Sequence, residues 1–203
     1  MNRAELKSQA KAQIKGKIGI LFLITLLIGL ISGAASAILS LIPVVGSLIA
    51  AVIVTPAFTL SLYRVYLTVC NGETPVVGDT FSGFDDFWSA FKLTLLMGLY
   101  IFLWSLLFYI PGIVKAISYS MSYYILAENK GKSARECITE SKEMTQGHKW
   151  ELFVLGLSFI GWLLLCGITF GIAYIWVGPY MQATYTNAYK LLKGTPSVEI
   201  VGE

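Results

Sequence analysis

The sequence predicts an all-α, polytopic membrane protein with six transmembrane helices. They are paired as three hairpins, and each hairpin is preceded by a short amphipathic interfacial helix. Of the 203 residues, 56% are hydrophobic and 13% are charged, a charged share about half that of an average soluble domain. A soluble fold of this size cannot hide so much apolar surface, whereas a bilayer acts as its solvent. Long uncharged stretches and a one-sided distribution of lysine and arginine support the same prediction.

Five nearly uncharged stretches are long enough to cross about 30 Å of hydrocarbon, which takes roughly 20 helical residues. They are Ile18–Ile42, Gly46–Cys70, Leu93–Ile110, Leu152–Ile168 and Gly171–Leu192. The more polar segment Gly112–Ala127 is expected to be a sixth span, because otherwise the basic loops would fall on different sides. The chain is then one membrane domain, 1–203, with hairpin units at about 1–72, 80–129 and 132–194 and a short polar tail at 195–203.

Positive charge marks one side of the membrane. Basic residues precede the first hairpin (Arg3, Lys7, Lys11, Lys15, Lys17), precede the third (Lys130, Lys132, Arg135, Lys142, Lys149) and end the last helix (Lys190, Lys193). The opposite side receives three short turns, at Pro43–Gly46, Pro111–Gly112 and Gly167–Gly171. Because cytoplasmic loops carry an excess of lysine and arginine, we expect a multi-pass protein of the cell membrane with both termini in the cytoplasm. The start also resembles a signal peptide, but its apolar run continues well past the small residues 32–37, so a retained helix is favoured.

Each hairpin is preceded by a capping signal, in which a polar residue is followed three positions later by an acid. The pairs are Asn2 and Glu5, Ser82 and Asp85, and Ser133 and Glu136. Two of these segments then carry lysines or aromatic residues at helical spacing, as helices in the membrane interface do. The candidate lipid-contacting residues are Lys7, Lys11, Lys15, Phe84, Phe87 and Trp88. Because the basic run leads straight into an apolar segment, we expect anionic lipid headgroups as partners and no nucleic acid.

The first and third units resemble each other in sequence. Pro56 and Pro179 are each followed ten residues later by a tyrosine, Tyr66 and Tyr189, and then by a glycine and a Thr-Pro pair. Both units enter the membrane in the same sense, which predicts a parallel repeat. The middle unit matches less well, because its Pro111 falls in the expected turn.

Four polar residues are candidates for the membrane interior: Lys115, Tyr119, Gln182 and Asn187. A charge inside a membrane indicates a functional site by default, although Lys115 is close enough to a turn to reach the membrane surface. Aromatic residues near segment ends are interpreted as interfacial belts. They are Tyr63, Tyr66, Trp88, Tyr109, Tyr123, Tyr124, Trp150, Tyr185 and Tyr189. The small residues Gly29, Gly33 and Ala37 indicate either close helix packing or a homo-oligomer face.

Motifs of common catalytic sites are missing from the sequence, which contains no HExxH, GxSxG, Walker loop or Gly-x-Gly-x-x-Gly. The three cysteines lack CxxC spacing, and a single histidine argues against a zinc site of ordinary composition. His148 and Glu151 can form an acid–base pair at the start of the fifth helix, but an interfacial junction is the favoured interpretation. We therefore predict no catalytic, cofactor-binding or metal-binding residues and no enzymatic activity.

Two stretches of the chain resemble the signatures of a known family. Residues Phe108–Ala116, Tyr119–Met121 and Tyr124–Asn129 are similar to its central signature, and Ser141–Met144 with Gly147–Phe153 are similar to its second. The family is a group of small integral membrane proteins, chiefly from Gram-positive bacteria, known as domain of unknown function 975. The resemblance implies a multi-spanning plasma-membrane protein and supplies no activity, cofactor or catalytic residue.

Three classes of function remain open. The leading hypothesis is a non-enzymatic membrane component that binds lipids or a membrane-protein partner, with an accessory, immunity or envelope-stress role. The alternative is a transporter or channel for an apolar or amphiphilic solute, which predicts a mid-membrane cavity reached by Lys115, Gln182 or Asn187. The third is a membrane enzyme acting on lipid headgroups, which would need His148, Glu151 and a cytoplasmic polar pocket together.

Overall fold

A computed structural model describes residues 2–39, 54–107 and 109–194, and every regular element in this part of the chain is helical. The elements are α1 (Arg3–Ile14), α2 (Ile18–Leu39), α4 (Thr55–Cys70), the 3-10 helix η2 (Val77–Asp86), α5 (Phe87–Leu107), α6 (Tyr109–Tyr119), α7 (Ser122–Glu128), α8 (Ala134–Met144), α9 (Lys149–Leu157), α10 (Ile160–Ile168) and α11 (Tyr174–Lys193). The predicted all-α class is confirmed. The expected turn at Pro43–Gly46 and the tail at 195–203 lie outside the described residues.

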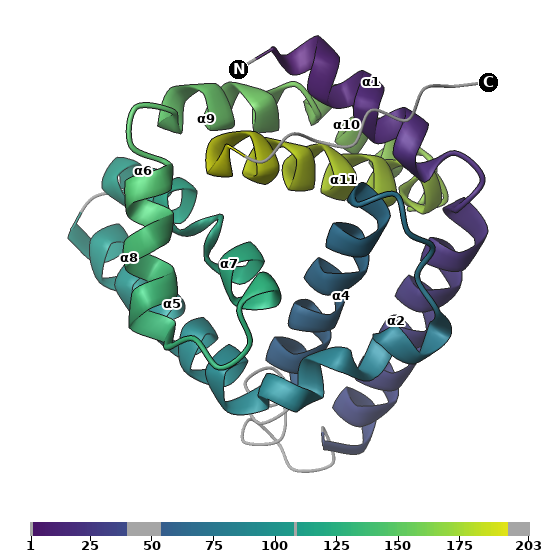
Figure 1. Cartoon of the computed structure of the whole chain (residues 1–203), viewed down its shortest axis with the longest axis horizontal. Helices are drawn as coiled ribbons and strands as arrows, with labels where there is room; N and C mark the ends of the chain where they lie inside the picture. The colour runs from purple at the N-terminus through teal and green to yellow at the C-terminus, as the bar shows by residue number, and fades with distance from the viewer. Residues whose placement is uncertain (1, 40–53, 108, 195–203) are drawn as a thin grey trace.

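Three stretches of helix in the described part are long and apolar enough to cross a membrane. They are Ile18–Ile38, Val77–Leu106 and Lys149–Ile168, and each contains the first member of a predicted hairpin. The returning helices α4, α6, α7 and α11 are shorter or more polar, so six spans are not shown. Figure 1 also shows the three hairpins along the sides of a triangle, so their axes do not share one direction.

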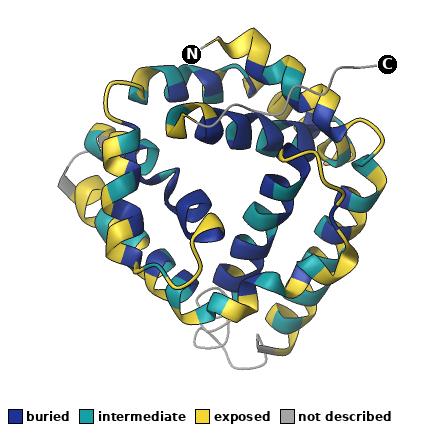
Figure 2. Ribbon diagram, in the orientation of Figure 1, coloured by how far each residue is buried: buried dark blue, intermediate teal, exposed yellow. Residues whose placement is uncertain are grey.

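The helices form an outer and an inner layer. The returning helices α4, α7 and α11 carry most of the buried residues, as Figure 2 shows, whereas α2, α5 and α9–α10 make up the outer layer. Large apolar side chains of the outer helices are exposed, for example Leu30 at 61%, Phe102 at 63% and Leu164 at 64%. A continuous apolar surface of this kind is costly in water and compatible with lipid. The fold is therefore that of a membrane protein.

The amphipathic helices bury their apolar stripes against protein. Leu6, Ala10 and Ile14 of α1 are buried, and α1 packs along α11. In the same way α8 packs on α5 and α7, and η2 packs on α4. The sequence indicated a helix in the membrane interface, whereas in the structure the apolar stripe of α1 is covered by the inner layer. The ring of units is closed where α1, at the start of the chain, covers α11 at its end.

Two of the three predicted caps are confirmed. The side chain of Asn2 accepts hydrogen bonds from the backbone of Ala4 (3.2 Å) and Glu5 (3.5 Å). Ser133 and Glu136 form a reciprocal capping box. The prediction for Ser82 is wrong, because its hydroxyl donates to the Asp79 carbonyl within a 3-10 helix.

Two of the long helical segments are interrupted. The predicted span Gly112–Ala127 breaks between α6 and α7, and the segment 149–168 breaks between α9 and α10. The expected turn at Pro111–Gly112 instead lies in the first turn of α6, where proline is tolerated. The turn at Gly167–Gly171 is confirmed, with left-handed backbone at Phe170 and Gly171.

Candidate functional site

A cavity of about 540 Å³ lies between the inner helices and the helices of the second and third units. Its walls come from α4, α5, α6, α7, α9, α10 and α11, and the lining is mainly apolar. The polar groups on its walls are Tyr63, Ser120, Tyr123, Tyr124, Gln182 and Tyr185. Small-molecule sites commonly combine such an apolar wall with a few polar groups, in volumes of about 300–1,000 Å³.

Stacked tyrosines form the inner wall of this cavity. The ring of Tyr63 stacks on Tyr123 with 5.3 Å between centroids and meets the edge of Tyr124 at 4.4 Å. Tyr124 in turn stacks on Tyr189 at 5.0 Å. The amide Nε2 of Gln182 donates to the Tyr124 hydroxyl at 3.2 Å. The wall is therefore rigid and carries hydroxyl and amide groups beside the cavity.

The mouth of the cavity opens onto the apolar surface. Ile113 of α6, Leu157 of α9 and Ile160 of α10 line it and are 40%, 44% and 48% exposed. These side chains belong to the surface that is compatible with lipid.

A second cavity of about 350 Å³ lies on the other side of α11, between α2 and α4. Thr25, Tyr66, Tyr174 and Gln182 supply polar groups to its otherwise apolar wall. Met181 and Gln182 line both cavities. One turn of α11 therefore separates two pockets in the apolar part of the molecule.

The predicted intramembrane polar residues do not converge. The ammonium group of Lys115 lies 4.5 Å from the ring centroid of Trp104 on α5. Asn187 is buried and donates from its side-chain amide to Gln13 of α1 at 2.9 Å. Tyr119 is buried beneath Lys142 of α8, whose ammonium lies 5.7 Å from the tyrosine ring centroid. Of the three residues expected to reach a cavity, Gln182 lines both described cavities, whereas Lys115 and Asn187 line neither.

The candidate lipid-contacting lysines differ in their surroundings. Lys7 donates to the Ser158 carbonyl at 3.2 Å, at the break between α9 and α10, and lies 4.3 Å from the ring centroid of Phe159. Burial, followed by the charges of Arg3 and Lys11, lowers the pKa of Lys7. Lys11 lies 5.4 Å from the ring centroid of Tyr180, although most of its residue surface is exposed. Lys15 is exposed. Lys7 thus has a structural role in holding α1.

The candidate aromatic residues cluster where η2 meets α5. Phe84 packs edge-on against Phe58 of α4 at 5.1 Å and is 44% exposed. Phe87 is half-buried, and Trp88 is 68% exposed and meets it edge-on. Phe84 and Trp88 therefore keep a free apolar surface, as interfacial anchors do.

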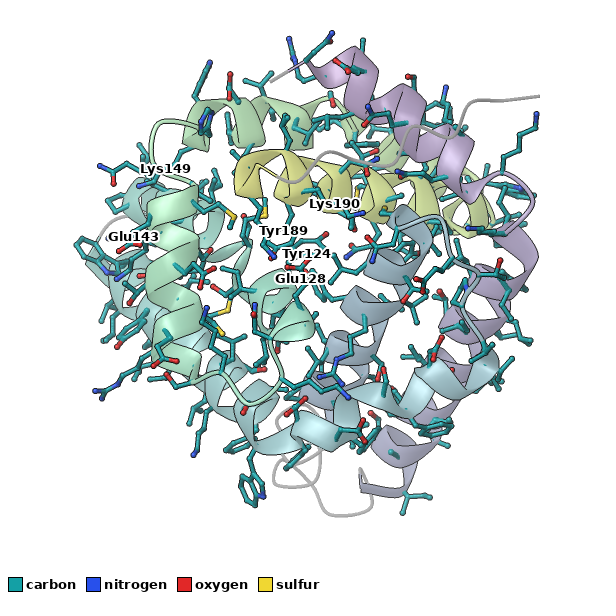
Figure 3. The ribbon with its side chains drawn as sticks, in the orientation of Figure 1. Tyr124, Glu128, Glu143, Lys149, Tyr189 and Lys190 are labelled. Carbon is teal, nitrogen blue, oxygen red and sulfur yellow. The ribbon has the colours of Figure 1, made fainter. Side chains whose placement is uncertain are left out.

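A polar cluster joins the ends of the inner helices. Figure 3 shows Tyr124, Glu128, Tyr189 and Lys190 near the centre of the view, with Glu143 and Lys149 towards the edge. Tyr189 donates to Glu128 at 2.8 Å, and Lys193 forms an ion pair with the same carboxylate. The buried Lys190 donates to the Cys70 carbonyl at 2.7 Å. These contacts are satisfied within the protein and hold α4, α7 and α11 together.

The acid–base pair considered from the sequence is formed, with 2.7 Å between His148 Nδ1 and Glu151 Oε2. Both side chains are exposed, and neither residue lines a described cavity. Among the described residues, no group of three or more His, Cys, Asp or Glu side chains could hold a metal ion.

Sequence reasoning missed the tyrosines of the cavity. Tyr63, Tyr123, Tyr124 and Tyr185 were assigned to interfacial belts, whereas they line an internal wall. The helical spacing of Gln182, Tyr185 and Tyr189 on α11 was a usable signal, because it puts an amide and two phenols on one face.

Comparison with known proteins identifies a family. Residues 1–118 and 108–195 match the family model described as protein of unknown function (DUF975). No curated protein and no solved structure matches the chain.

Proposed function

The chain belongs to the DUF975 family of proteins of unknown function, and we propose that it is a multi-pass cell-membrane protein that binds an amphiphile without acting on it. The observation that carries this proposal is the cavity of about 540 Å³, which opens between α6 and α9–α10 onto apolar surface. A hydrocarbon chain fits its apolar wall, and a polar end finds the hydroxyl and amide groups of the inner wall. Binding of a lipid or related amphiphile is the function that this arrangement supports best.

Transport and catalysis have less support. The polar residues expected to mark a translocation path lie apart, with Lys115 on Trp104 and Asn187 on Gln13. A headgroup enzyme would need His148 and Glu151 beside a polar pocket, and neither residue lines a described cavity. We therefore assign the protein a binding role in the membrane.

The proposed topology places both termini and the loops after α4 and α7 in the cytoplasm. The distribution of lysine and arginine supports it. Single cysteines placed at Ser8, Lys130 and Thr169 in a background without Cys70, Cys137 and Cys166 test it. A membrane-impermeant maleimide should label only the Thr169 variant in intact cells and all three after lysis. Labelling at Ser8 or Lys130 in intact cells would contradict the topology.

The cavity itself is tested by photolabelling. The protein is placed in phosphatidylcholine nanodiscs with amphiphiles that carry a diazirine in a hexadecyl chain, and the labelled peptides are identified by mass spectrometry. We expect labels in the segments 113–124 and 152–160, which contain most of the residues that line the cavity. Ala116→Phe puts a ring into the cavity and should abolish these labels.

Ala34→Phe is the matched control, because Ala34 is exposed on α2 and lines neither cavity. This variant should label as the unchanged protein does. If the cavity peptides are never labelled by any probe, or are labelled equally in both variants, the proposed function is incorrect.

A further inference from the structure

The polar groups on the cavity wall share one property, which is that none of them is charged. They are three tyrosines of the inner wall together with Ser120, Gln182 and Tyr185. Among the described residues, no Lys, Arg, His, Asp or Glu side chain lines this cavity. Resting on the proposed function, we infer that the ligand is an uncharged amphiphile, with a hydrocarbon chain and a hydroxyl or carbonyl head such as that of a long-chain alcohol or monoacylglycerol.

Two lysines near the cavity are directed elsewhere. Lys115 precedes the lining residue Ala116, but its ammonium group lies over Trp104 on α5. Lys7 is held by the Ser158 carbonyl, next to the lining residue Leu157. These cations have partners within the protein, and neither offers a countercharge to a ligand in the cavity.

The acid that meets the tyrosine stack through Tyr189 is also paired. Glu128 accepts from Tyr189 at 2.8 Å and forms an ion pair with Lys193. It therefore does not supply a free carboxylate for a cationic head. The arrangement offers neither sign of charge to the cavity.

This arrangement selects against ions for a physical reason. An ionised head that leaves water for an apolar cavity loses its hydration, and without a paired countercharge the loss is not compensated. A hydroxyl or carbonyl head loses much less and regains hydrogen bonds from neutral partners. The amide of Gln182, which already donates to Tyr124, and the Ser120 hydroxyl are such partners.

The experiment compares three photoreactive probes with the same hexadecyl chain in the same nanodiscs. The heads are an alcohol, a sulfate and a trimethylammonium group, so that the two ions stay charged at every working pH. We expect the alcohol to label residues 113–124 and 152–160 about tenfold more strongly than either ion, which corresponds to roughly 1.4 kcal/mol of preference. The exposed residues 102–106 of α5, which line neither described cavity, serve as the reference for how much of each probe enters the bilayer.

A charge placed in the cavity should reverse the preference. Ser120→Lys adds an ammonium group to the wall, and we expect the sulfate probe then to label the cavity peptides more strongly than the alcohol. Ala34→Lys, on the exposed face of α2, should leave the order of the probes unchanged. Thermal unfolding of each variant shows whether it is folded, and Ala116→Lys is the second site for the same test.

The outcomes separate the two proposals. Equal labelling of the cavity by all three probes would overturn the assignment of an uncharged ligand and leave the binding cavity intact. Stronger labelling by the sulfate or the trimethylammonium probe in the unchanged protein would also overturn the assignment of an uncharged ligand, and would indicate a ligand with the charge of that probe. Absence of cavity labelling by every probe would overturn both.

Discussion

Replacement of Ser141 by alanine removes the side chain that bridges the break between α6 and α7. Ser141 comes from α8 and is fully buried. Its hydroxyl donates to the Ser118 carbonyl at 2.8 Å and accepts from the Met121 N–H at 3.2 Å. One hydroxyl therefore satisfies a donor and an acceptor of the interrupted helix.

The two groups are affected differently by the change. The Ser118 carbonyl keeps the Thr145 hydroxyl, at 3.4 Å. The Met121 N–H loses its acceptor in a buried site, and a buried donor left without a partner costs about 1–3 kcal/mol. We therefore expect Ser141→Ala to lower the free energy of unfolding by about 1–3 kcal/mol. For a chain of this size, each kcal/mol lowers the melting temperature by roughly 2–4 °C.

The measurement is thermal unfolding in a mild detergent, followed by tryptophan fluorescence. Ser118→Ala is the matched control, because its hydroxyl donates only to the Val114 carbonyl of its own helix at 2.8 Å. That change should cost less than about 1 kcal/mol, since no group of the break loses its partner. If Ser141→Ala melts no lower than Ser118→Ala, the bridging role is refuted.

Three further changes have defined outcomes. A Cβ at Gly83 would lie 2.0 Å from a backbone carbonyl of α4, so Gly83→Ala should lower the free energy of unfolding by about 1–3 kcal/mol or more. Gly78 has open space around it, so Gly78→Ala should not have this effect. Equal melting temperatures of the two variants would contradict the packing of η2. Gln13→Leu should lower the melting temperature and speed proteolysis of α1, because it breaks the buried amide pair between α1 and α11. An unchanged rate of proteolysis would show that this pair does not hold α1 in place. Burial raises the pKa of the Cys137 thiol to about 11, so its thiolate is scarce at pH 8. Alkylation of Cys137, measured by mass spectrometry, should therefore be slow until the protein is unfolded, while the cysteine of a Ser8→Cys variant reacts at once. Fast alkylation of Cys137 in the folded protein would contradict its burial.

The helical class and the long apolar helices follow largely from the sequence. Apolar stretches such as Ile18–Ile38 are long enough to be recognised by length and composition alone. The stripes Leu6, Ala10 and Ile14 on α1 were also visible, because residues four apart share a helix face. Either lipid or another helix can cover such a stripe, and which of them does so depends on the tertiary fold.

The helix breaks show why the span prediction went further than the structure. Hydropathy does not register a missing backbone hydrogen bond, so the segment Gly112–Ala127 reads as one helix. In the structure the break is stabilised by Ser141, a residue of α8. The second break is stabilised by Lys7, which is distant in sequence from Ser158. A break that depends on a distant partner cannot be read from the local pattern.

The candidate site could be predicted from the sequence only in part, for a related reason. Gln182 was recognised because an amide in an apolar stretch is unusual. Tyr63 and Tyr124 were assigned to the membrane surface, because a tyrosine near a helix end has the same local pattern in both environments. Their edge-to-face contact between α4 and α7 depends on how those helices pack. The neutral character of the cavity became visible only once its walls were assembled.

The arrangement of the units extends the repeat that the sequence indicated. The inner helices α4, α7 and α11 are each followed by a glycine in the left-handed region, Gly72, Gly131 and Gly194. After α4 and α7, the next amphipathic element packs back on the inner helix just completed, η2 on α4 and α8 on α7. On α11 the corresponding place is taken by α1, from the start of the chain. The middle unit was obscured in the sequence because its inner helix is interrupted, whereas its packing follows the same rule. A chain whose first helix completes its last unit forms a closed ring, and this closure fixes α11 with Gln182 between the two cavities.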